Sequence, residues 1–259
     1  MEKGKKHGQS PCQIAVIHGG PGAAGDVTDL AQELGKNYGV LEPYQTANTI
    51  AGQVTELKEI IEKNRQIPVT LIGHSWGAFL SFIFTAYHPQ LVKKLILVSS
   101  GVFSQKYVNR IGEIRLGRIS PEQGQKIKEL TRELNNFNNP DSNLAFSQFG
   151  ELIAEVDAYD PLPIKNKCQS DFAIYQNVWP KFQKLRKSGK LTELGRKITC
   201  PVVVVHGNYD PRPAEGIKNP LFSVIKDFKF ILLKNCGHYP WREKEAKDNF
   251  FQIIRKEVQ

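Results

Sequence analysis

The segment LIGHSWGAF, residues 71–79, sets Ser75 between two glycines, Gly73 and Gly77. An apolar run leads into the segment and a helical pattern follows it, which indicates a strand, a tight turn and a helix. Glycines two positions either side of a serine indicate a turn so tight that side chains at those positions would clash. Such a strained turn lifts a serine hydroxyl clear of a sheet, and we therefore predict that Ser75 serves chemistry.

Outward from this turn, short apolar runs alternate with helical patterns. The runs predict strands at 12–18, 39–44, 68–73, 94–100, 200–207 and 228–235. The patterns between them predict helices at 27–34, 50–62 and 77–88, with a last helix from about Glu243. Strands that are apolar on both faces and separated by helices are typical of a parallel sheet covered on both sides. The sequence therefore predicts an α/β fold with a mostly parallel sheet and helices on both faces.

The alternation of predicted strands and helices stops between about residues 103 and 197, where the patterns are helical and no strong strand run occurs. SPEQ at 120–123 indicates a helix start, with an N-cap serine and a capping-box glutamine. An apolar stripe at helical spacing follows between Leu144 and Val156, and core packing is its favoured interpretation over a ligand surface. We predict a core made of residues 1–101 and 199–259 and a helical cap, or lid, made of residues 102–198.

Length and composition indicate a globular protein and argue against a membrane-spanning or secreted one. A chain of 259 residues that is 40% hydrophobic can bury a sizeable core as one domain with an insertion. No apolar run approaches the roughly 18–20 residues of a membrane span, so we expect no membrane partner. The charged start MEKGKKHGQSPC lacks the apolar stretch of a secretory signal. The four cysteines form no CxxC pair, which predicts reduced thiols in a cytoplasmic protein.

The net charge of +9 raises the question of a nucleic-acid partner. The densest basic run, KFQKLRKSGK at 181–190, has only Phe182 and Leu185 as apolar residues. That pattern favours a solvated helix face over a base-stacking platform, so we expect no nucleic-acid partner. A preference for anionic substrates is an alternative reading of the charge.

A serine hydroxyl needs a base to remove its proton and an acid to orient that base. Of the six histidines, His238 is favoured as the base, because it follows the last predicted strand in CGHYPW. Asp210 follows the preceding strand in HGNYDPRP and is the favoured acid. In a parallel sheet these strand ends meet at the edge where Ser75 is exposed. We therefore predict Ser75 as the nucleophile, His238 as the base and Asp210 as the acid.

The motif HGGPG, residues 18–22, follows the first predicted strand. Its glycines let the backbone approach a reacting carbonyl closely. Since Pro21 has no N–H, we predict that the N–H groups of Gly20 and Trp76 form the oxyanion hole.

The same loop supports a rival interpretation. Residues 20–25 match GxGxxG, and Glu42 lies 20 residues beyond Gly22, as in a dinucleotide-binding domain. Against it, Pro21 removes a donor from the phosphate cradle, and the motifs around Ser75, Asp210 and His238 stay unexplained. A dinucleotide-binding or non-catalytic protein is kept as an alternative.

The motifs HGGPG, GHSWG, HGNYD and CGHYPW occur in this order around a helical segment, and the chain resembles the α/β-hydrolase superfamily over its whole length. The resemblance implies the α/β-hydrolase fold, a triad of Ser75, Asp210 and His238, and oxyanion N–H groups from Gly20 and Trp76. HGGPG with a tryptophan after the serine is similar to the proline iminopeptidase branch. The DxRGxGxS-type stretch of that branch is replaced here by AAGDVTDLAQEL and YQTANTIAGQ.

We accordingly expect a serine hydrolase that cleaves ester or amide bonds of small acyl substrates through an acyl-enzyme, with no cofactor and no metal. Aromatic residues of the cap are expected to line an apolar pocket with Trp76, Tyr239 and Trp241. An aminopeptidase acting on short peptides is the alternative, and it needs cap carboxylates to hold a substrate ammonium. The candidates for that role are Glu151, Glu155, Asp157 and Asp160. The oligomeric state is not predicted.

Overall fold

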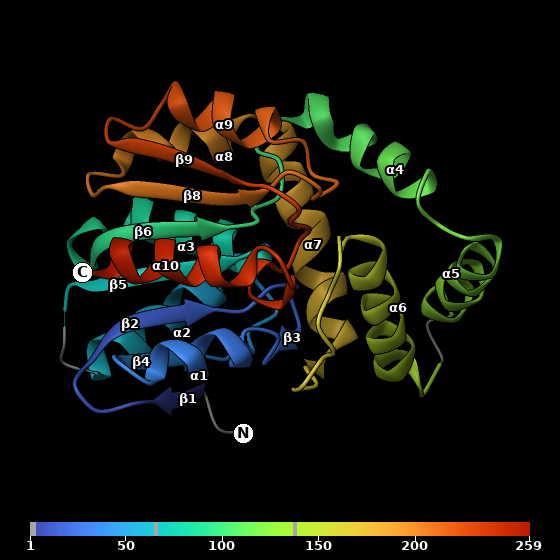
Figure 1. Ribbon diagram of the computed structural model, residues 1–259, viewed down its shortest axis with the longest axis horizontal. Helices are drawn as coiled ribbons and strands as arrows, with labels where there is room; N and C mark the ends of the chain where they lie inside the picture. Colours follow the sequence, from blue (N-terminus) through green and yellow to red (C-terminus); the bar gives the residue numbers. More distant parts are fainter. Residues whose placement is uncertain (1–3, 65–66, 137–138) are drawn as a thin grey trace.

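The computed structural model describes residues 4–64, 67–136 and 139–259 (Figure 1). Within these ranges a seven-stranded sheet has the strand order β1-β4-β2-β5-β6-β8-β9. Strand β1 runs antiparallel to β4, and the other neighbouring pairs of this sheet are parallel. The strands are β1 (Gly4–His7), β2 (Cys12–Ile17), β4 (Gly39–Pro43), β5 (Val69–His74), β6 (Val92–Val98), β8 (Val202–Gly207) and β9 (Phe228–Leu233). The prediction of a mostly parallel sheet is confirmed.

Successive side chains of the central strands enter two separate hydrophobic cores. In β5, Leu71 packs into one core and Ile72 into the other, and Leu95 and Ile96 of β6 divide in the same way. This division follows from the two-residue period of a strand. Both faces are therefore apolar, which explains why these strands read as continuous hydrophobic runs.

Helices cover both faces of the sheet. Figure 1 shows α1 (Thr28–Gly35) and α10 (Lys247–Val258) in front of the sheet, and α2 (Ile50–Lys63) and α3 (Trp76–Tyr87) behind it. Residues of α1 and α10 belong to one hydrophobic core, and residues of α2, α3 and α9 (Glu215–Phe222) belong to the other. The expected α/β architecture with helices on both faces is confirmed.

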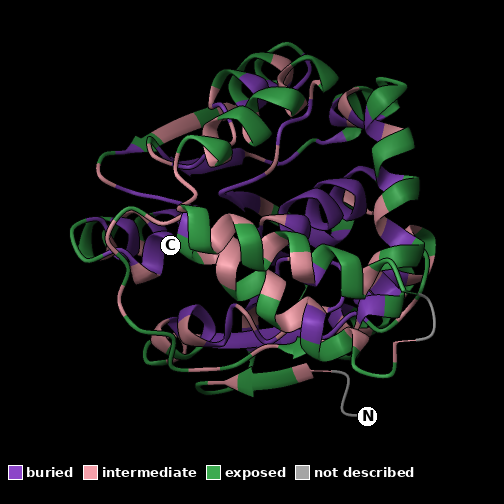
Figure 2. Cartoon of the chain, turned by 90° about the vertical axis from the view of Figure 1, so that its right-hand side faces the viewer, coloured by how far each residue is buried: buried purple, intermediate pink, exposed green. Residues whose placement is uncertain are grey.

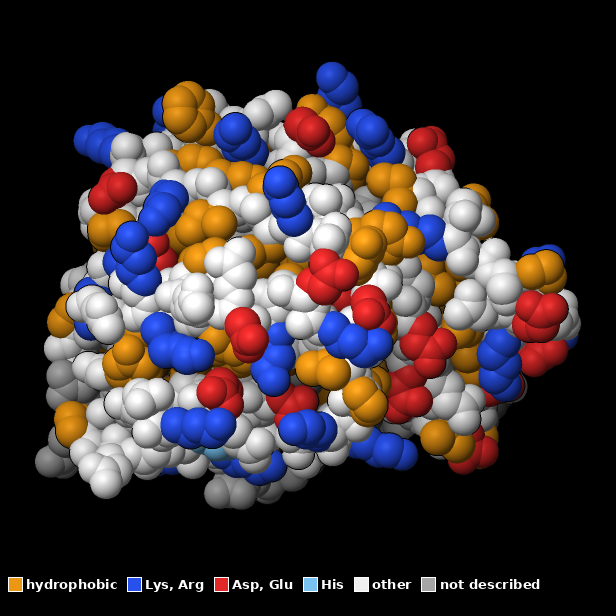
Figure 3. All heavy atoms as spheres, in the orientation of Figure 1, with side chains coloured by type: hydrophobic (Ala, Val, Ile, Leu, Met, Phe, Trp, Pro, Cys, Tyr) orange, Lys and Arg blue, Asp and Glu red, His pale blue; other side chains and the backbone are white. Residues whose placement is uncertain are grey.

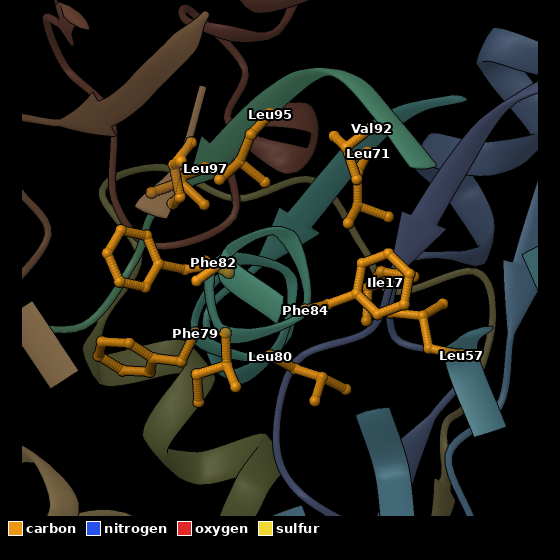
Figure 4. Packing of buried hydrophobic residues seen from close by; sticks show 14 of the residues in the cluster. Ile17, Leu57, Leu71, Phe79, Leu80, Phe82, Phe84, Val92, Leu95 and Leu97 are labelled. Carbon is orange, nitrogen blue, oxygen red and sulfur yellow. The ribbon is translucent and has the colours of Figure 1, made fainter. Parts of the chain in front are cut away.

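Helix α3 is buried on nearly all of its circumference. Figure 4 shows its phenylalanines reaching different neighbours, with Phe84 beside Ile17 of β2. On the side away from the sheet, Phe79 meets the ring of Phe182 with centroids 4.4 Å apart. Helix α3 therefore holds Ser75, at its N-terminal end, on a rigid support.

The chain between β6 and β8 forms helices α4 (Val108–Leu116), α5 (Pro121–Leu134), α6 (Ser142–Val156), α7 (Phe172–Lys187) and α8 (Lys190–Glu193). It also contains a short strand, β7 (Gln169–Ser170), where only helices were expected. β7 pairs with β3 (Ala23–Ala24), which lies in the loop after β2. This pairing ties the helical segment to the loop that carries HGGPG. The division into core and cap at residues 102 and 198 stays a prediction.

The surface of the described residues is polar and carries charges of both signs (Figure 2, Figure 3). Figure 2 shows exposed residues on the outer helices and buried residues gathered inside. On the face drawn in Figure 3, Lys and Arg side chains are interspersed with Asp and Glu and form no continuous basic stripe. No helix in the described ranges has the length and apolar character needed to cross a membrane. The expectation about the charged start falls partly on residues 1–3, which lie outside the described residues.

Candidate active site

Ser75 lies in the turn between β5 and α3 with a backbone φ of 52°. A Cβ atom on Gly73 would overlap the carbonyl oxygen of Gly77, and a Cβ on Gly77 would overlap the carbonyl oxygens of Ile17 and His18. The two glycines therefore let α3 begin directly against β5 and β2. A serine in the left-handed region is strained, and such strain clusters at functional sites.

His238 and Asp210 meet beside the same cavity that Ser75 lines. His238 follows β9, Asp210 follows β8, and His238 Nδ1 donates a hydrogen bond of 2.7 Å to Asp210 Oδ2. Both residues are buried, with 3% and 6% of their surfaces exposed. The other oxygen of Asp210 accepts hydrogen bonds from the backbone N–H and the guanidinium of Arg212, at 3.0 and 3.1 Å. The imidazole of His238 is thus oriented by a carboxylate that is itself fixed.

The charges around this pair determine its protonation. Burial and the positive charge of Arg212 lower the pKa of His238 to about 4. Burial alone would raise the pKa of Asp210, but the positive charges of His238 and Arg212 hold it well below its usual range. At neutral pH His238 is therefore a free base beside an ionised Asp210.

A buried pair that sequence reasoning did not single out, Asp26 and His74, connects three segments around Ser75. His74 Nδ1 lies 3.2 Å from Asp26 Oδ2, and its Nε2 lies 3.0 Å from the carbonyl oxygen of His238, both within hydrogen-bond distance. The N–H of Gly19 donates to the second oxygen of Asp26 at 2.9 Å. The glycine-rich loop, the serine turn and the histidine loop are therefore held together by one acid and one imidazole.

The two predicted oxyanion residues, Gly20 and Trp76, line the same cavity as Ser75. Gly20 has a φ of 47°, and its carbonyl oxygen accepts the N–H of Ala23 at 3.0 Å, which closes a tight turn. Trp76 is the first residue of α3, where backbone N–H groups have no intrahelical partner. Gly20, Ser75 and Trp76 all line the cavity.

The three aromatic residues expected in the pocket divide between the cavity wall and the core. Trp76 and Tyr239 line the cavity. Trp241 does not lie among the residues that line it, and this expectation needs correction. Its ring packs edge-on against His74, with centroids 4.7 Å apart, and against Phe250 of α10 at 6.1 Å. The 3-10 turn at Pro240–Arg242 carries it below the site, into the core.

The cavity has a volume of about 660 Å³, which is ample for a small organic substrate. Helix α7 supplies an aromatic face to it, with Phe172, Tyr175 and Trp179 at helical spacing. The rings of Phe172 and Tyr175, and those of Tyr175 and Trp179, are stacked with centroids 6.1 Å apart in both pairs. This face gives the cavity a continuous apolar wall.

Asp157, one of the acids considered for holding an ammonium, is buried and already paired. Arg115 donates to its two oxygens at 2.7 and 2.5 Å, and Arg212 donates to one of them at 2.6 Å. The carbonyl oxygen of Asp157 also accepts the N–H of His238 at 3.1 Å. Asp157 therefore fixes the histidine loop against α6 instead of presenting a free charge to the cavity.

Of the other three acids, Glu151 and Glu155 are exposed and Asp160 is half-buried. Asp160 pairs with Lys244 at the surface at 2.6 Å, and Glu155 does not line the cavity. Glu151 lines the cavity, where Ser147 Oγ donates to it over 3.5 Å. Of the four acids, only Glu151 faces the cavity without a cationic partner in the described part of the chain.

The residues of the rival dinucleotide pattern are engaged elsewhere. Glu42 is fully buried within β4. One of its oxygens accepts a hydrogen bond of 2.6 Å from Thr28, and the other one of 2.7 Å from His7. It is therefore not available to a ribose. Within the described ranges, no group of three or more His, Cys, Asp or Glu side chains is arranged to hold a metal ion.

Comparison with known proteins identifies the class. Residues 20–241 match the model of the alpha/beta hydrolase fold family. The chain belongs to this family. The prediction of an α/β hydrolase is thereby confirmed.

This α/β hydrolase has relatives that carry the name proline iminopeptidase. The one from Saccharolobus solfataricus is 25% identical, covering 94% of this chain and 83% of that protein. The one from Lactobacillus crispatus is 26% identical, covering 98% and 91%. The crystal structure of VinJ is similar in fold, with a TM-score of 0.67 at 16% identity over 98% of this chain and 93% of that one.

Proposed function

We propose that this α/β hydrolase cleaves ester or amide bonds of small acyl substrates through a serine-bound intermediate. His238 removes the proton of the Ser75 hydroxyl as the oxygen attacks the substrate carbonyl. Asp210 holds the imidazole in the correct tautomer and stabilises the imidazolium that forms. The oxyanion accepts hydrogen bonds from the N–H groups of Gly20 and Trp76.

The second half of the reaction uses the same residues. His238 gives its proton to the leaving group, which departs and leaves an acyl group on Ser75. Water then enters, His238 takes a proton from it, and the hydroxide attacks the acyl carbonyl to release the acid. This scheme involves no cofactor and no metal.

One observation carries the proposal: a strained serine lines the same cavity as a buried histidine that donates a 2.7 Å hydrogen bond to a buried aspartate. The order Ser75, Asp210, His238 along the chain is the order of the triad in this fold. Residues 102–198 supply much of the cavity wall, which supports a role as a lid over the substrate. The free cysteines support a reducing, cytoplasmic location, and we include no nucleic-acid partner in the proposal.

Covalent labelling tests the proposal. A fluorophosphonate should label Ser75, and Ser75→Ala should abolish both labelling and ester turnover. Ser99→Ala is a matched control, because Ser99 also follows a parallel strand with a positive φ, of 45°, but lies outside the cavity wall. Labelling of another serine with turnover intact in Ser75→Ala would refute the assignment of the nucleophile.

An aminopeptidase is the second candidate function. The relatives named proline iminopeptidase align over nearly the whole chain, and Glu151 presents a carboxylate to the cavity. An aminopeptidase would bind the ammonium of a peptide N-terminus through such a carboxylate. It would use the same serine chemistry, so the two candidates differ in substrate and not in mechanism.

A further inference from the structure

Arg186, near the end of α7, is a buried cation without a partner. Only 5% of its surface is exposed, and its Nε atom is buried with no hydrogen-bond partner. In the described part of the chain, no hydrogen bond or ion pair reaches its guanidinium. Burial lowers the pKa of Arg186, and no neighbouring carboxylate opposes that shift. A buried guanidinium without a counter-ion is costly, and arginine cannot avoid the cost by losing its proton.

The surroundings of Arg186 offset only part of this cost. Its guanidinium lies 5.6 Å from the centroid of the Phe182 ring, a cation–π contact. It also lies in the last turn of α7, whose C-terminal end favours positive charge. Neither interaction uses the five N–H donors of the guanidinium.

The guanidinium borders the cavity that holds Ser75 and His238. Arg186 lines this cavity, and it follows Tyr175, Trp179 and Gln183 on the same face of α7. Two other arginines in the wall, Arg115 and Arg212, pair with Asp157. A third, Arg242, is half-buried and lies over the ring of Tyr239, 4.9 Å from its centroid. The guanidinium of Arg186 is therefore an unneutralised positive charge at one end of the aromatic wall, where an anionic group of a ligand could bind.

Arg186 lies further along α7 than the residues that pack on Trp76, the neighbour of Ser75 in the chain. The Trp76 ring, next to Ser75 in the chain, packs against Trp179 and Phe182 with centroids 6.5 and 5.3 Å apart. Arg186 lies four to seven residues further along the helix, which is roughly 6–10 Å at about 1.5 Å per residue. A substrate would span this gap with an apolar body.

We propose that Arg186 binds a carboxylate at the far end of the substrate, so that the preferred substrates are esters or amides whose apolar body carries a single negative charge. This inference rests on the proposed function and names its substrate class. A planar carboxylate matches the two-pronged guanidinium. A phosphate, with a charge of about −1.5 to −2, would need a second buried cation. Among the arginines and lysines that line the cavity in the described part of the chain, only Arg186 is buried and without an ion pair.

The test uses paired substrates that differ only in the charge. The p-nitrophenyl monoesters of adipic to sebacic acid carry a free carboxylate, and their methyl p-nitrophenyl diesters are the neutral partners. Chains of adipic acid or longer avoid intramolecular attack of the carboxylate on the ester. At the best chain length, wild-type kcat/KM should favour the monoester over its diester by tenfold or more, which is about 1.4 kcal/mol.

Variants of Arg186 should change this ratio, in which any general loss of activity cancels. Arg186→Met should bring the monoester-to-diester ratio of kcat/KM close to one. Arg186→Lys should give an intermediate ratio, because lysine keeps the positive charge but cannot form two parallel hydrogen bonds to a carboxylate. Lys184→Met removes an exposed charge from the same helix and should keep the wild-type ratio. Arg186→Gln replaces Arg186→Met if the latter does not fold. A wild-type ratio of one or less at every chain length, or equal ratios in wild type and Arg186→Met, would overturn the proposal.

Binding separates this inference from the proposed function. Calorimetry should show monomethyl suberate binding to wild type at least tenfold more tightly than to Arg186→Met. If that holds while no ester is turned over, the carboxylate site stands and the proposed hydrolysis fails. If esters are turned over through Ser75 with a ratio of one and equal binding, hydrolysis stands and the carboxylate site fails.

Discussion

The acid limb of the pH profile should report the unusual protonation of His238. The limb of kcat/KM reflects ionisation of the free enzyme, and the proposed base must be neutral to act. The pKa of His238 is lowered from 6.5 to about 4 by burial and by the charge of Arg212. This difference corresponds to roughly 3 kcal/mol at about 1.36 kcal/mol per pKa unit. With a neutral p-nitrophenyl ester, kcat/KM should stay level from about pH 8 to pH 5 and fall to half near pH 4.

Removal of Arg212 should raise the pH at the midpoint of the acid limb of kcat/KM. Without the guanidinium, the imidazolium form of His238 is less repelled and the charge of Asp210 is less balanced, so the midpoint should rise towards 6.5. The assay follows p-nitrophenol at the wavelength where its two forms absorb equally, with Arg212→Met beside wild type. Lys244→Met, which removes an exposed charge, should leave the midpoint in place. A wild-type midpoint near 6.5, or a lower midpoint in Arg212→Met, would refute this account of the electrostatics.

Three further predictions test the site. Asp210→Asn should keep the circular dichroism spectrum and lower kcat by about 10³–10⁴, because His238 loses its oriented tautomer; near wild-type kcat would place the acid elsewhere. Asp157→Asn should reduce the free energy of unfolding in urea by about 3–5 kcal/mol, since two arginines lose a buried partner. Asp160→Asn, at an exposed pair, should cost less than about 1 kcal/mol, and equal losses would contradict the role given to burial. An N-acetylated aminoacyl ester should be hydrolysed at least as well as its free amine, and a tenfold preference for the amine would put the aminopeptidase first.

The sheet could be predicted because its strands are buried on both faces. Runs such as LILV in β6 and VVVV in β8 are rich in β-branched and other apolar residues and are typical of strands that lie between two layers of helix. The serine turn could be predicted because only glycine fits at positions 73 and 77. Strand β1 could not, because GKKH has no apolar alternation and owes its conformation to pairing with β4.

The site residues could be predicted only where the order of the strands along the chain determines where the following residues lie. Asp210 and His238 follow neighbouring parallel strands, so they must meet at one edge of the sheet. Asp26 lies 48 residues from its partner His74, and no local pattern indicates such a contact. Trp241 was wrongly predicted to line the pocket. It is close to His238 in sequence, but that closeness does not determine the direction in which the short turn between them points the Trp241 ring.

The charged residues of the cavity wall determine how well anionic, neutral and cationic substrates should bind. Among the described residues, four acids line the cavity. Asp157 is neutralised by two arginines, and Asp26 is held by His74 and Gly19. Asp29 accepts a hydrogen bond from Asn166, and Glu151 is exposed and screened by water. Arg186 is buried and faces no opposing charge. A unit charge about 8 Å from it, at an effective dielectric constant of about 20, would interact with it by roughly 2 kcal/mol. That energy favours a carboxylate and opposes an ammonium, so the cavity should prefer anionic over neutral and neutral over cationic substrates. An aminopeptidase, which needs a site for a substrate ammonium, is then the less favoured of the two candidate functions.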